Sequence, residues 1–256
     1  MRVAAVIPAR MQSTRLPGKP LLRIAGVPMI LRVLERVRAS PELDRVIVAT
    51  DSEEICRVVE GAGGEARLTS VHHRTGSDRV AEVAGSLAEE FILNVQGDEP
   101  LLPVSTITSL VKFARSSPRM TVASAMVPLL QDVDIVNPNV TKVVVGAGGN
   151  ALYFSRYPIP YRKQAPLKFR ADQAATRSVT GYFKHVGIYL YEREFLQKYV
   201  RLAPTPLEIS ESLEQLRVLE HGYVIHMVQV EEDSVSVDTP EDAALVERII
   251  LEGNSG

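Results

Sequence analysis

The chain has a single cysteine, Cys56, in 256 residues, which excludes an internal disulfide framework and fits a reducing compartment. Net charge is also small, at −2, and no basic stripe with interleaved aromatic residues is present, which argues against a nucleic-acid partner. No apolar run approaches the length of a membrane span, and the N-terminus lacks the basic start and apolar segment of a signal peptide. We therefore expect a cytoplasmic protein that binds no nucleic acid and does not insert into membranes.

Two widespread nucleotide-binding signatures are missing as well. No Gly-x-Gly-x-x-Gly follows the first strand-like run and no Gly-x-x-x-x-Gly-Lys-Ser/Thr occurs, which disfavours a dinucleotide oxidoreductase and a P-loop phosphotransferase. The adjacent His72 and His73 have no cysteine or acid at ligand spacing, so we expect no zinc site there. The sequence also contains no internal repeat and no low-complexity segment.

Apolar runs of strand length alternate with segments of helical period in the first hundred residues. Strands are expected at 3–7, 46–50 and 91–95, and helices at 29–37 and 52–60. This alternation predicts right-handed βαβ crossovers, and therefore an α/β fold with a mostly parallel sheet. Because the strand segments are apolar almost throughout, we expect helices on both faces of the sheet.

The pattern changes between about residues 122 and 200. Short extended pieces occur at 122–128, 142–145, 151–154 and 186–191, around a polar, proline-bearing stretch at 157–180. This pattern predicts an inserted, smaller and more antiparallel lobe. A helix-period segment at 207–219, a strand at 224–230 and a helix that opens at Thr239-Pro240 then return the chain to the main domain.

Three cations lie in one loop that follows the first expected strand. Arg10, Arg15 and Lys19 stand in a segment stiffened by glycine and proline, together with two hydroxyl side chains. Such a loop can direct N–H groups, hydroxyls and fixed cations at the oxygens of a triphosphate. In open α/β sheets, ligands bind at the carboxyl ends of the strands, where this loop begins. The alternative is a basic surface loop whose charges are merely solvated.

Two carboxylates are candidate ligands of a divalent cation. Asp98 follows the buried strand at 91–95, at the same sheet edge as the cationic loop, and Asp238 precedes the last helix. Mg²⁺ on a nucleotide is commonly held by one or two carboxylates together with water and phosphate oxygens. The alternatives are a turn aspartate that bonds to its own backbone for Asp98, and a helix cap for Asp238.

Several motifs occur in the order typical of one enzyme family. They are Ser-Thr-Arg-Leu-Pro-Gly-Lys-Pro-Leu at 13–21, Val-Gln-Gly-Asp-Glu-Pro at 95–100 and Val-Asp-Thr-Pro-Glu-Asp at 237–242. With these motifs the chain resembles, over nearly its whole length, the 3-deoxy-manno-octulosonate cytidylyltransferase (CMP-Kdo synthetase) family. The resemblance implies a Rossmann-like nucleotidyltransferase fold over residues 1–256, with the lobe at about 122–200 binding the sugar and joining two copies in a homodimer.

The resemblance also implies how the nucleotide and the metal are bound. The expected contacts to CTP are Ala9, Arg10, Ser13, Arg15, Lys19, Thr75, Ser77 and Gln96. Thr75 and Ser77 exchange the two hydroxyl types of the family's loop around cytosine and ribose, and Arg79 in this loop is either a ligand contact or the partner of a nearby acid. Asp98 and Asp238 are implied to hold Mg²⁺, and with Lys19 and Arg10 they form the expected catalytic set.

For the sugar, the resemblance implies a site on three separate segments. The expected contacts are Arg156, His185, Tyr189, Glu214 and Gln215, in which an arginine would bind the carboxylate of the acid sugar and a histidine or tyrosine its hydroxyls. Around Arg162 and Lys163 the chain departs from the family's pattern, so no contact is assigned there.

The expected activity is CMP transfer from CTP to 3-deoxy-D-manno-octulosonate (Kdo), which activates Kdo for lipopolysaccharide biosynthesis. One alternative is a sibling cytidylyltransferase for sialic acid or amino-Kdo. The other is a catalytically silent nucleotide-binding regulator with the same fold.

Overall fold

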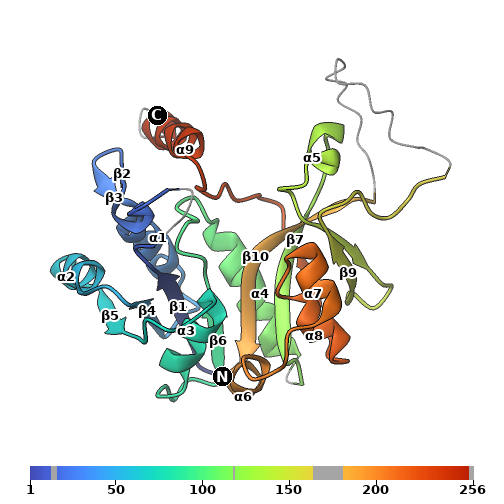
Figure 1. Ribbon diagram of the computed structural model, residues 1–256, viewed down its shortest axis with the longest axis horizontal. Helices are drawn as coiled ribbons and strands as arrows, with labels where there is room; N and C mark the ends of the chain where they lie inside the picture. The colour runs from blue at the N-terminus through green and yellow to red at the C-terminus, as the bar shows by residue number, and fades with distance from the viewer. Residues whose placement is uncertain (13–15, 118, 164–180, 254–256) are drawn as a thin grey trace.

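A mixed β-sheet runs through the centre of the computed structural model, which describes residues 1–12, 16–117, 119–163 and 181–253. In these residues nine strands form one sheet, with the main order β11-β7-β10-β6-β1-β4-β5 (Figure 1). Its strands are β1 (Val3–Ala9), β4 (Arg45–Thr50), β5 (Glu65–Leu68), β6 (Phe91–Asn94), β7 (Val122–Pro128), β8 (Lys142–Val145), β9 (Ala151–Ser155), β10 (Phe183–Glu192) and β11 (His226–Gln229).

Most neighbouring strands on this main path have the same direction. β1 pairs in parallel with both β4 and β6, and β4 pairs in parallel with β5. β10 lies antiparallel between β6 and β7, while β11 is parallel to β7. β10 is therefore the one reversed strand of the main path described here. The α/β fold with a mostly parallel sheet, expected from the sequence, is confirmed.

Helices cover both faces of the sheet, as the apolar strands predict. One face packs against α1 (Met29–Arg38), α2 (Glu53–Gly61) and α4 (Val104–Ser116). The other packs against α3 (Gly76–Ala84), α6 (Arg193–Tyr199) and α8 (Leu216–Glu220). Successive side chains of a strand point to opposite faces, so β1 sends Val3, Ala5 and Ile7 to the first layer and Ala4 and Val6 to the second. Burial on both faces stabilises β1 as the central strand.

Between residues 122 and 200, the strands pair antiparallel to one another. β10 pairs with β7 and also with β8, and β8 pairs with β9. All four strands belong to the one sheet, with β7 and β10 on its main path and β8 and β9 off that path. The short helix α5 (Asp132–Val136) lies on the same side of the molecule as β9 (Figure 1). The assignment of this stretch as a sugar-binding and dimerisation lobe stays a prediction.

The prediction of one helix-period segment at 207–219 is wrong in detail, because the chain forms two short helices there. α7 (Pro206–Glu211) ends at Ser212, which has a left-handed φ of 52°. The guanidinium of Arg156 donates from Nε to the carbonyl of Glu211 at 2.9 Å and from Nη2 to that of Ser212 at 3.4 Å. These donors satisfy carbonyls that a continuing helix would use, so a residue distant in sequence ends α7.

The last helix, α9 (Pro240–Gly253), packs against the N-terminal hairpin of β2 (Arg23–Ile24) and β3 (Val27–Pro28). Ile24 and Met29 share a small apolar cluster with Val237 and Val246. The C-terminal segment is thereby held near the loop that follows β1. No helix in the described ranges is both long and apolar enough to cross a bilayer.

Candidate active site

The candidate phosphate loop begins where β1 ends. Ala9 is buried as the last residue of β1, and Arg10 is exposed directly after it. Gly18 has a φ of 71° and donates its N–H to the carbonyl of Met11 at 3.2 Å, which closes the loop. Glycine suits this position because residues with a side chain rarely adopt the left-handed conformation. The predicted CTP contacts Ser13 and Arg15 lie outside the described residues.

Lys19 joins the two candidate metal ligands. It begins the short 3₁₀ helix η1 (Lys19–Leu21), and its Nζ lies 2.6 Å from Asp98 Oδ2 and 3.1 Å from Asp238 Oδ1. The lysine side chain is 12% exposed, against 29% for Asp98 and 36% for Asp238. Asp98 and Asp238 lie 79 and 219 positions after Lys19 in the sequence, yet all three side chains meet in one cluster of a cation and two carboxylates. The sequence predicts that Asp98 and Asp238 lie close together but not that Lys19 pairs with both, and their role as metal ligands stays a prediction.

The turn that carries Asp98 is held close to β1 by a glycine. A Cβ placed on Gly97 would lie 2.6 Å from the carbonyl oxygen of Pro8, a contact that real side chains do not make. The carbonyl of Asp98 accepts the N–H of Val237 at 2.9 Å, which fixes the C-terminal segment against this turn. Gly97 was not singled out from the sequence. Its signal is the glycine directly before the candidate ligand in Gln-Gly-Asp.

The cap of α9 is formed by residues other than the candidate ligand. Thr239 Oγ1 accepts the N–H of Asp242 at 3.2 Å, and the carboxylate of Asp242 accepts the N–H groups of Asp238 and Thr239 at 3.0 and 2.8 Å. The helix start at Thr239-Pro240 that the sequence predicts is therefore confirmed, with Thr239 as its N-cap. Since Asp242 supplies the capping carboxylate, Asp238 directs Oδ1 to Lys19, and the capping alternative for Asp238 loses its support.

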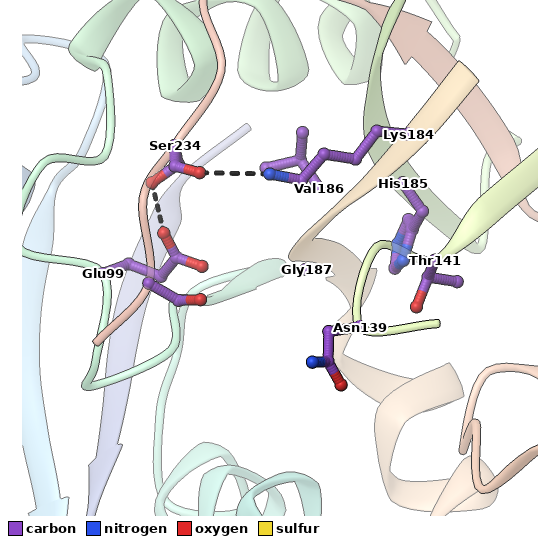
Figure 2. A pocket seen from close by; sticks show the side chains of 9 residues that line it. Glu99, Asn139, Thr141, Lys184, His185, Val186, Gly187 and Ser234 are labelled. Carbon is purple, nitrogen blue, oxygen red and sulfur yellow. Dashed lines mark hydrogen bonds between the residues drawn. The ribbon is translucent and has the colours of Figure 1, made fainter. Parts of the chain in front are cut away.

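A polar cavity of about 160 Å³ lies between this turn and β10 (Figure 2). On one wall, the hydroxyl of Ser234 donates to the carboxylate of Glu99, and the ammonium of Lys184 donates to the carbonyl of Ser234 at 3.2 Å. Lys184 also pairs with Asp233 at 2.8 Å. Burial raises the pKa of Glu99 to about 7. These contacts tie the segment before Asp238 to both β10 and the Asp98 turn.

Sequence reasoning did not single out Glu99, Lys184 or Ser234. Glu99 offered a signal, since it directly follows Asp98 in the same motif. Ser234 lies in a loop without a motif of its own, so only the fold reveals its contacts.

The loop before α3 links the predicted nucleotide and sugar contacts. Thr75 caps α3 by accepting the N–H of Asp78 at 3.1 Å, and Asp78 accepts the N–H of Thr75 in return. Ser77 is buried and donates its hydroxyl to Glu214 at 2.9 Å. Arg79 pairs with Asp51 at 2.7 Å, so the alternative of a structural partner is the one observed. The contacts of Thr75 and Ser77 with CTP stay predictions.

Gln96 and Gly76 lie together at the same sheet edge. A Cβ on Gly76 would lie 3.3 Å from Cγ of Pro8 and 4.0 Å from Oε1 of Gln96. The predicted CTP contact Gln96 is half-buried, and the short distance from Gly76 places its side-chain oxygen beside the loop before α3. The structure brings Gln96 and that loop together beside the end of β1.

The predicted sugar contacts His185 and Tyr189 lie close together on β10. Their ring centroids are 5.3 Å apart, and both side chains are less than a tenth exposed. Burial, with the nearby Lys184, lowers the pKa of His185 to about 3, and burial raises the pKa of Tyr189 well above 10. Both groups are therefore neutral near pH 7 and can only exchange uncharged hydrogen bonds with a ligand.

Glu214 and Gln215 lie between α7 and α8, where Gln215 is 4% exposed. Burial raises the pKa of Glu214, while its hydrogen bond from Ser77 opposes that shift. The carbonyl of Glu214 accepts from the hydroxyl of Tyr199 at 3.1 Å. The pair is thus held against the second helical layer.

Arg156 is built into the fold more firmly than a free carboxylate receptor would be. Besides its contacts at the end of α7, its Nη1 donates to the carbonyl of Pro138 at 3.1 Å. A guanidinium has five N–H donors, and the contacts with described residues use three of them, which leaves two for a ligand within that part of the chain. Binding of a sugar carboxylate by Arg156 stays a prediction. Arg162 and Lys163 remain without an assigned role.

Comparison with known proteins decides the family. A family model described as cytidylyltransferase matches residues 4–232. The chain is 45% identical over 247 residues to 3-deoxy-manno-octulosonate cytidylyltransferase of Syntrophotalea carbinolica, covering 96% of this chain and 98% of the relative. The chain belongs to the 3-deoxy-manno-octulosonate cytidylyltransferase family. The cytidylyltransferase of the same name from Pelobacter propionicus is 45% identical over 242 residues, which is 94% of each chain.

Solved structures agree with this membership. CMP:2-keto-3-deoxy-manno-octonic acid synthetase complexed with CTP superposes with a TM-score of 0.90 at 37% identity, covering 99% of this cytidylyltransferase and 100% of the other chain. A cytidylyltransferase from Leptospira borgpetersenii has a TM-score of 0.62 at 17% identity, covering 98% of this chain and 87% of the other, and shows the shared fold alone.

Proposed function

We propose that this protein transfers CMP from CTP to Kdo and thereby activates Kdo for lipopolysaccharide biosynthesis. Membership of a family that extends over almost the whole chain supports an enzyme of this kind. The observation that carries the proposal is the cluster of Lys19, Asp98 and Asp238 at the carboxyl edge of the sheet. This cluster combines a cation for phosphates with two oxygen ligands for a metal, as nucleotidyl transfer requires.

In the proposed reaction, the anomeric hydroxyl of Kdo attacks the α-phosphorus of CTP in line. The bond from the α-phosphorus to the bridging oxygen breaks, pyrophosphate leaves, and the hydroxyl proton passes to solvent. Positioning and charge stabilisation dominate such transfers. Lys19 and exposed Arg10 would stabilise the charge that develops on the pyrophosphate.

Asp98 and Asp238 fit the role of Mg²⁺ ligands. Their oxygens already converge on one cation, the ammonium of Lys19, and no cluster of three or more metal-binding side chains occurs within the described ranges. One or two carboxylates suffice when phosphate oxygens and water complete the shell. Bound Mg²⁺ would supply positive charge at the α-phosphate and orient the attacking hydroxyl. Lys19 must then leave the carboxylates, and the triphosphate offers it new anionic partners.

A pyrophosphate-release assay tests the activity directly. The assay contains CTP, Mg²⁺ and a panel of acid sugars, with each of the other nucleoside triphosphates as a control for base selection. We expect release with CTP and Kdo. Preferred turnover of sialic acid or amino-Kdo would replace the sugar assignment, and absence of release with every sugar would indicate the silent regulator.

Nucleotide titrations test the proposed phosphate contact of Lys19. Removal of its charge in Lys19→Met should weaken CTP far more than CMP, because CMP lacks the β- and γ-phosphates. Calorimetric titration of both nucleotides measures this difference. Lys112→Met, which removes an exposed lysine from α4, is the matched control and should leave both affinities unchanged. Equal weakening of CTP and CMP by Lys19→Met would contradict a grip on the distal phosphates.

We also propose that the enzyme is a cytoplasmic homodimer. Large apolar side chains are exposed on the smaller lobe and on the neighbouring helix α7, among them Leu152 of β9 at 63% and Ile209 of α7 at 68%. Such side chains in one region favour contact with a second copy. Light scattering at several protein concentrations tests the proposal, and a monomer throughout would contradict it.

A further inference from the structure

β10 contains an irregularity directly beside the predicted sugar contacts. Val186 pairs with Ala125 of β7, but the next pair along joins Tyr189 to Ser124, so β10 has extra residues at this point. Ser124 is fully buried in β7 and faces the bulge. Its Oγ lies 2.8 Å from the carbonyl oxygen of Ile188, 3.3 Å from that of Val186 and 2.8 Å from Nε2 of His185.

The hydroxyl of Ser124 has one hydrogen, and this fact fixes the direction of each bond. The carbonyl oxygen of Ile188 can only accept, so the contact at 2.8 Å uses the hydrogen of Ser124. The lone pairs of Oγ are then left for His185, whose Nε2 must carry a hydrogen to bond at 2.8 Å. If Ser124 donated to Nε2 of His185 instead, its Oγ and the carbonyl oxygen of Ile188 would lie 2.8 Å apart with no hydrogen between them, which is unfavourable.

The second nitrogen of the ring therefore carries no hydrogen when the imidazole is neutral. His185 is 7% exposed, and its ring lies 4.9 Å edge-on from Phe154. This apolar packing, with the cation of Lys184 nearby, lowers the pKa of His185 to about 3, which excludes a second proton near pH 7. Among the residues that the structure describes, no hydrogen-bond partner of Nδ1 is found. Nδ1 is thus an acceptor only.

His185 lines the same cavity as Glu99, Asn139 and Thr141, and Figure 2 shows it on the wall that Thr141 shares. The backbone N–H of His185 is already used, since it donates to the carbonyl of Thr141 at 2.8 Å. Nδ1 is consequently the polar atom that His185 can offer to a ligand. A carboxylate has no hydrogen to give it, whereas a hydroxyl has one.

We propose that Ser124 is a positioning residue that holds His185 in the Nε2–H tautomer, so that His185 accepts a hydrogen bond from a sugar hydroxyl and does not bind the sugar carboxylate. This inference rests on the proposed function, which places an acid sugar beside His185. Ser124 acts through His185 and touches no substrate itself. The carboxylate is left to cationic groups such as Arg156.

Nuclear magnetic resonance tests the tautomer without any substrate. Protonated and bare imidazole nitrogens differ strongly in ¹⁵N chemical shift, and the spectrum of His185→Gln identifies the signals of His185 by their loss. We expect the wild-type protein to carry the hydrogen on Nε2 from pH 6 to 8. Ser124→Ala should mix the two tautomers. A hydrogen on Nδ1 in the wild type would overturn the proposal, even if Ser124→Ala failed to fold.

Kinetics test the consequence for the sugar. A neutral hydrogen bond contributes about 0.5–1.5 kcal/mol, so Ser124→Ala should raise the KM for Kdo by roughly 2- to 12-fold and leave the KM for CTP unchanged. Thr106→Val is the matched control, because it removes another fully buried hydroxyl, from α4, and should change neither KM. An unchanged KM for Kdo in Ser124→Ala would refute the inference.

Single-deoxy analogues of Kdo identify the group that His185 recognises. One analogue should bind the wild type more weakly than Kdo, and Ser124→Ala should weaken that analogue less than it weakens Kdo, because the analogue lacks the hydroxyl whose bond to His185 the tautomer controls. If no analogue behaves in this way, the hydroxyl assignment is wrong. If the wild type releases pyrophosphate with no acid sugar, the proposed function fails, and the tautomer measurement still stands on its own.

Discussion

The two halves of the candidate site are built in opposite ways. On the nucleotide half, Arg10, Lys19, Asp98 and Asp238 are charged and partly exposed on segments beyond the strand ends. On the sugar half, His185 and other predicted contacts are buried inside paired elements and are neutral or held by several partners. Exposed charged groups on loops can exchange partners at a small cost in free energy. The protonation state of a buried group is instead set by the packing around it, because burial disfavours the charged form. Variants of the first half should therefore affect chemistry, and variants of the second half should affect binding and stability together.

The largest expected effect lies in the nucleotide half. Asp98→Asn and Asp238→Asn should each lower turnover by on the order of a hundredfold or more, the scale of losing one electrostatic stabiliser. Thermal unfolding should be little changed, because both side chains are partly exposed. Steady-state kinetics over a range of Mg²⁺ concentrations measures the loss.

The matched control for both variants is Asp134→Asn in α5, a helix that lies well apart from β1 and α9 in Figure 1. Its turnover should equal that of the wild type. Normal activity and Mg²⁺ dependence in either cluster variant would remove the metal assignment. A large loss of stability would instead break the contrast between the two halves.

The next effect in size concerns Arg156 in the sugar half. A charge-assisted contact to a carboxylate contributes about 1.5–3 kcal/mol, so Arg156→Ala should raise the KM for Kdo on the order of 10- to 100-fold. Its KM for CTP should stay the same. The variant should also unfold at a lower temperature, because the carbonyls of Pro138, Glu211 and Ser212 lose their donor. Wild-type kinetics with Kdo together with a lowered melting temperature would reduce Arg156 to a purely structural residue.

The buried histidine predicts a pH dependence of stability. The pKa of His185 is about 3 in the fold and about 6.5 in an unfolded chain, so the unfolded state takes up a proton first as the pH falls. Stability is therefore lost below pH 6.5, and between pH 7.5 and 5.5 the loss is about 1.4 kcal/mol, or tenfold in the unfolding equilibrium. Urea denaturation at both pH values checks this, with His185→Gln as the comparison. An equal pH dependence in that variant would show that other groups cause it.

The general architecture and the nucleotide half could be predicted from the sequence because they follow local rules. Apolar strands alternate with helices, and the segments that carry Lys19 and Asp98 both follow strands whose carboxyl ends lie at one edge. The strand end alone places Asp98, whereas the family resemblance implied that Asp238 completes the metal site with it. The direct contact of Lys19 with both was not foreseen, since it depends on how η1 meets the C-terminal segment.

The sugar half was less predictable because its geometry depends on contacts between distant segments. The break between α7 and α8 is stabilised by Arg156, which no helical periodicity can reveal. The role of Ser124 depends on the bulge in β10, and a serine in an apolar strand carries no signal of that kind. Family resemblance named the side chains of this half, and only the fold shows what holds them.

The smallest expected effect separates helix capping from chemistry at the C-terminal segment. Thr239→Ala removes the hydroxyl that accepts the N–H of Asp242, so α9 should lose about 1 kcal/mol of stability, which is about fivefold in the unfolding equilibrium. Turnover should be nearly unchanged, because the bond from Asp242 to the N–H of Asp238 remains and keeps Oδ1 of Asp238 near Lys19. Urea denaturation and steady-state kinetics on one preparation measure both quantities. A loss of turnover as large as that of Asp238→Asn would mean that the cap positions the carboxylate, and the nucleotide half would then depend on packing in the same way as the sugar half.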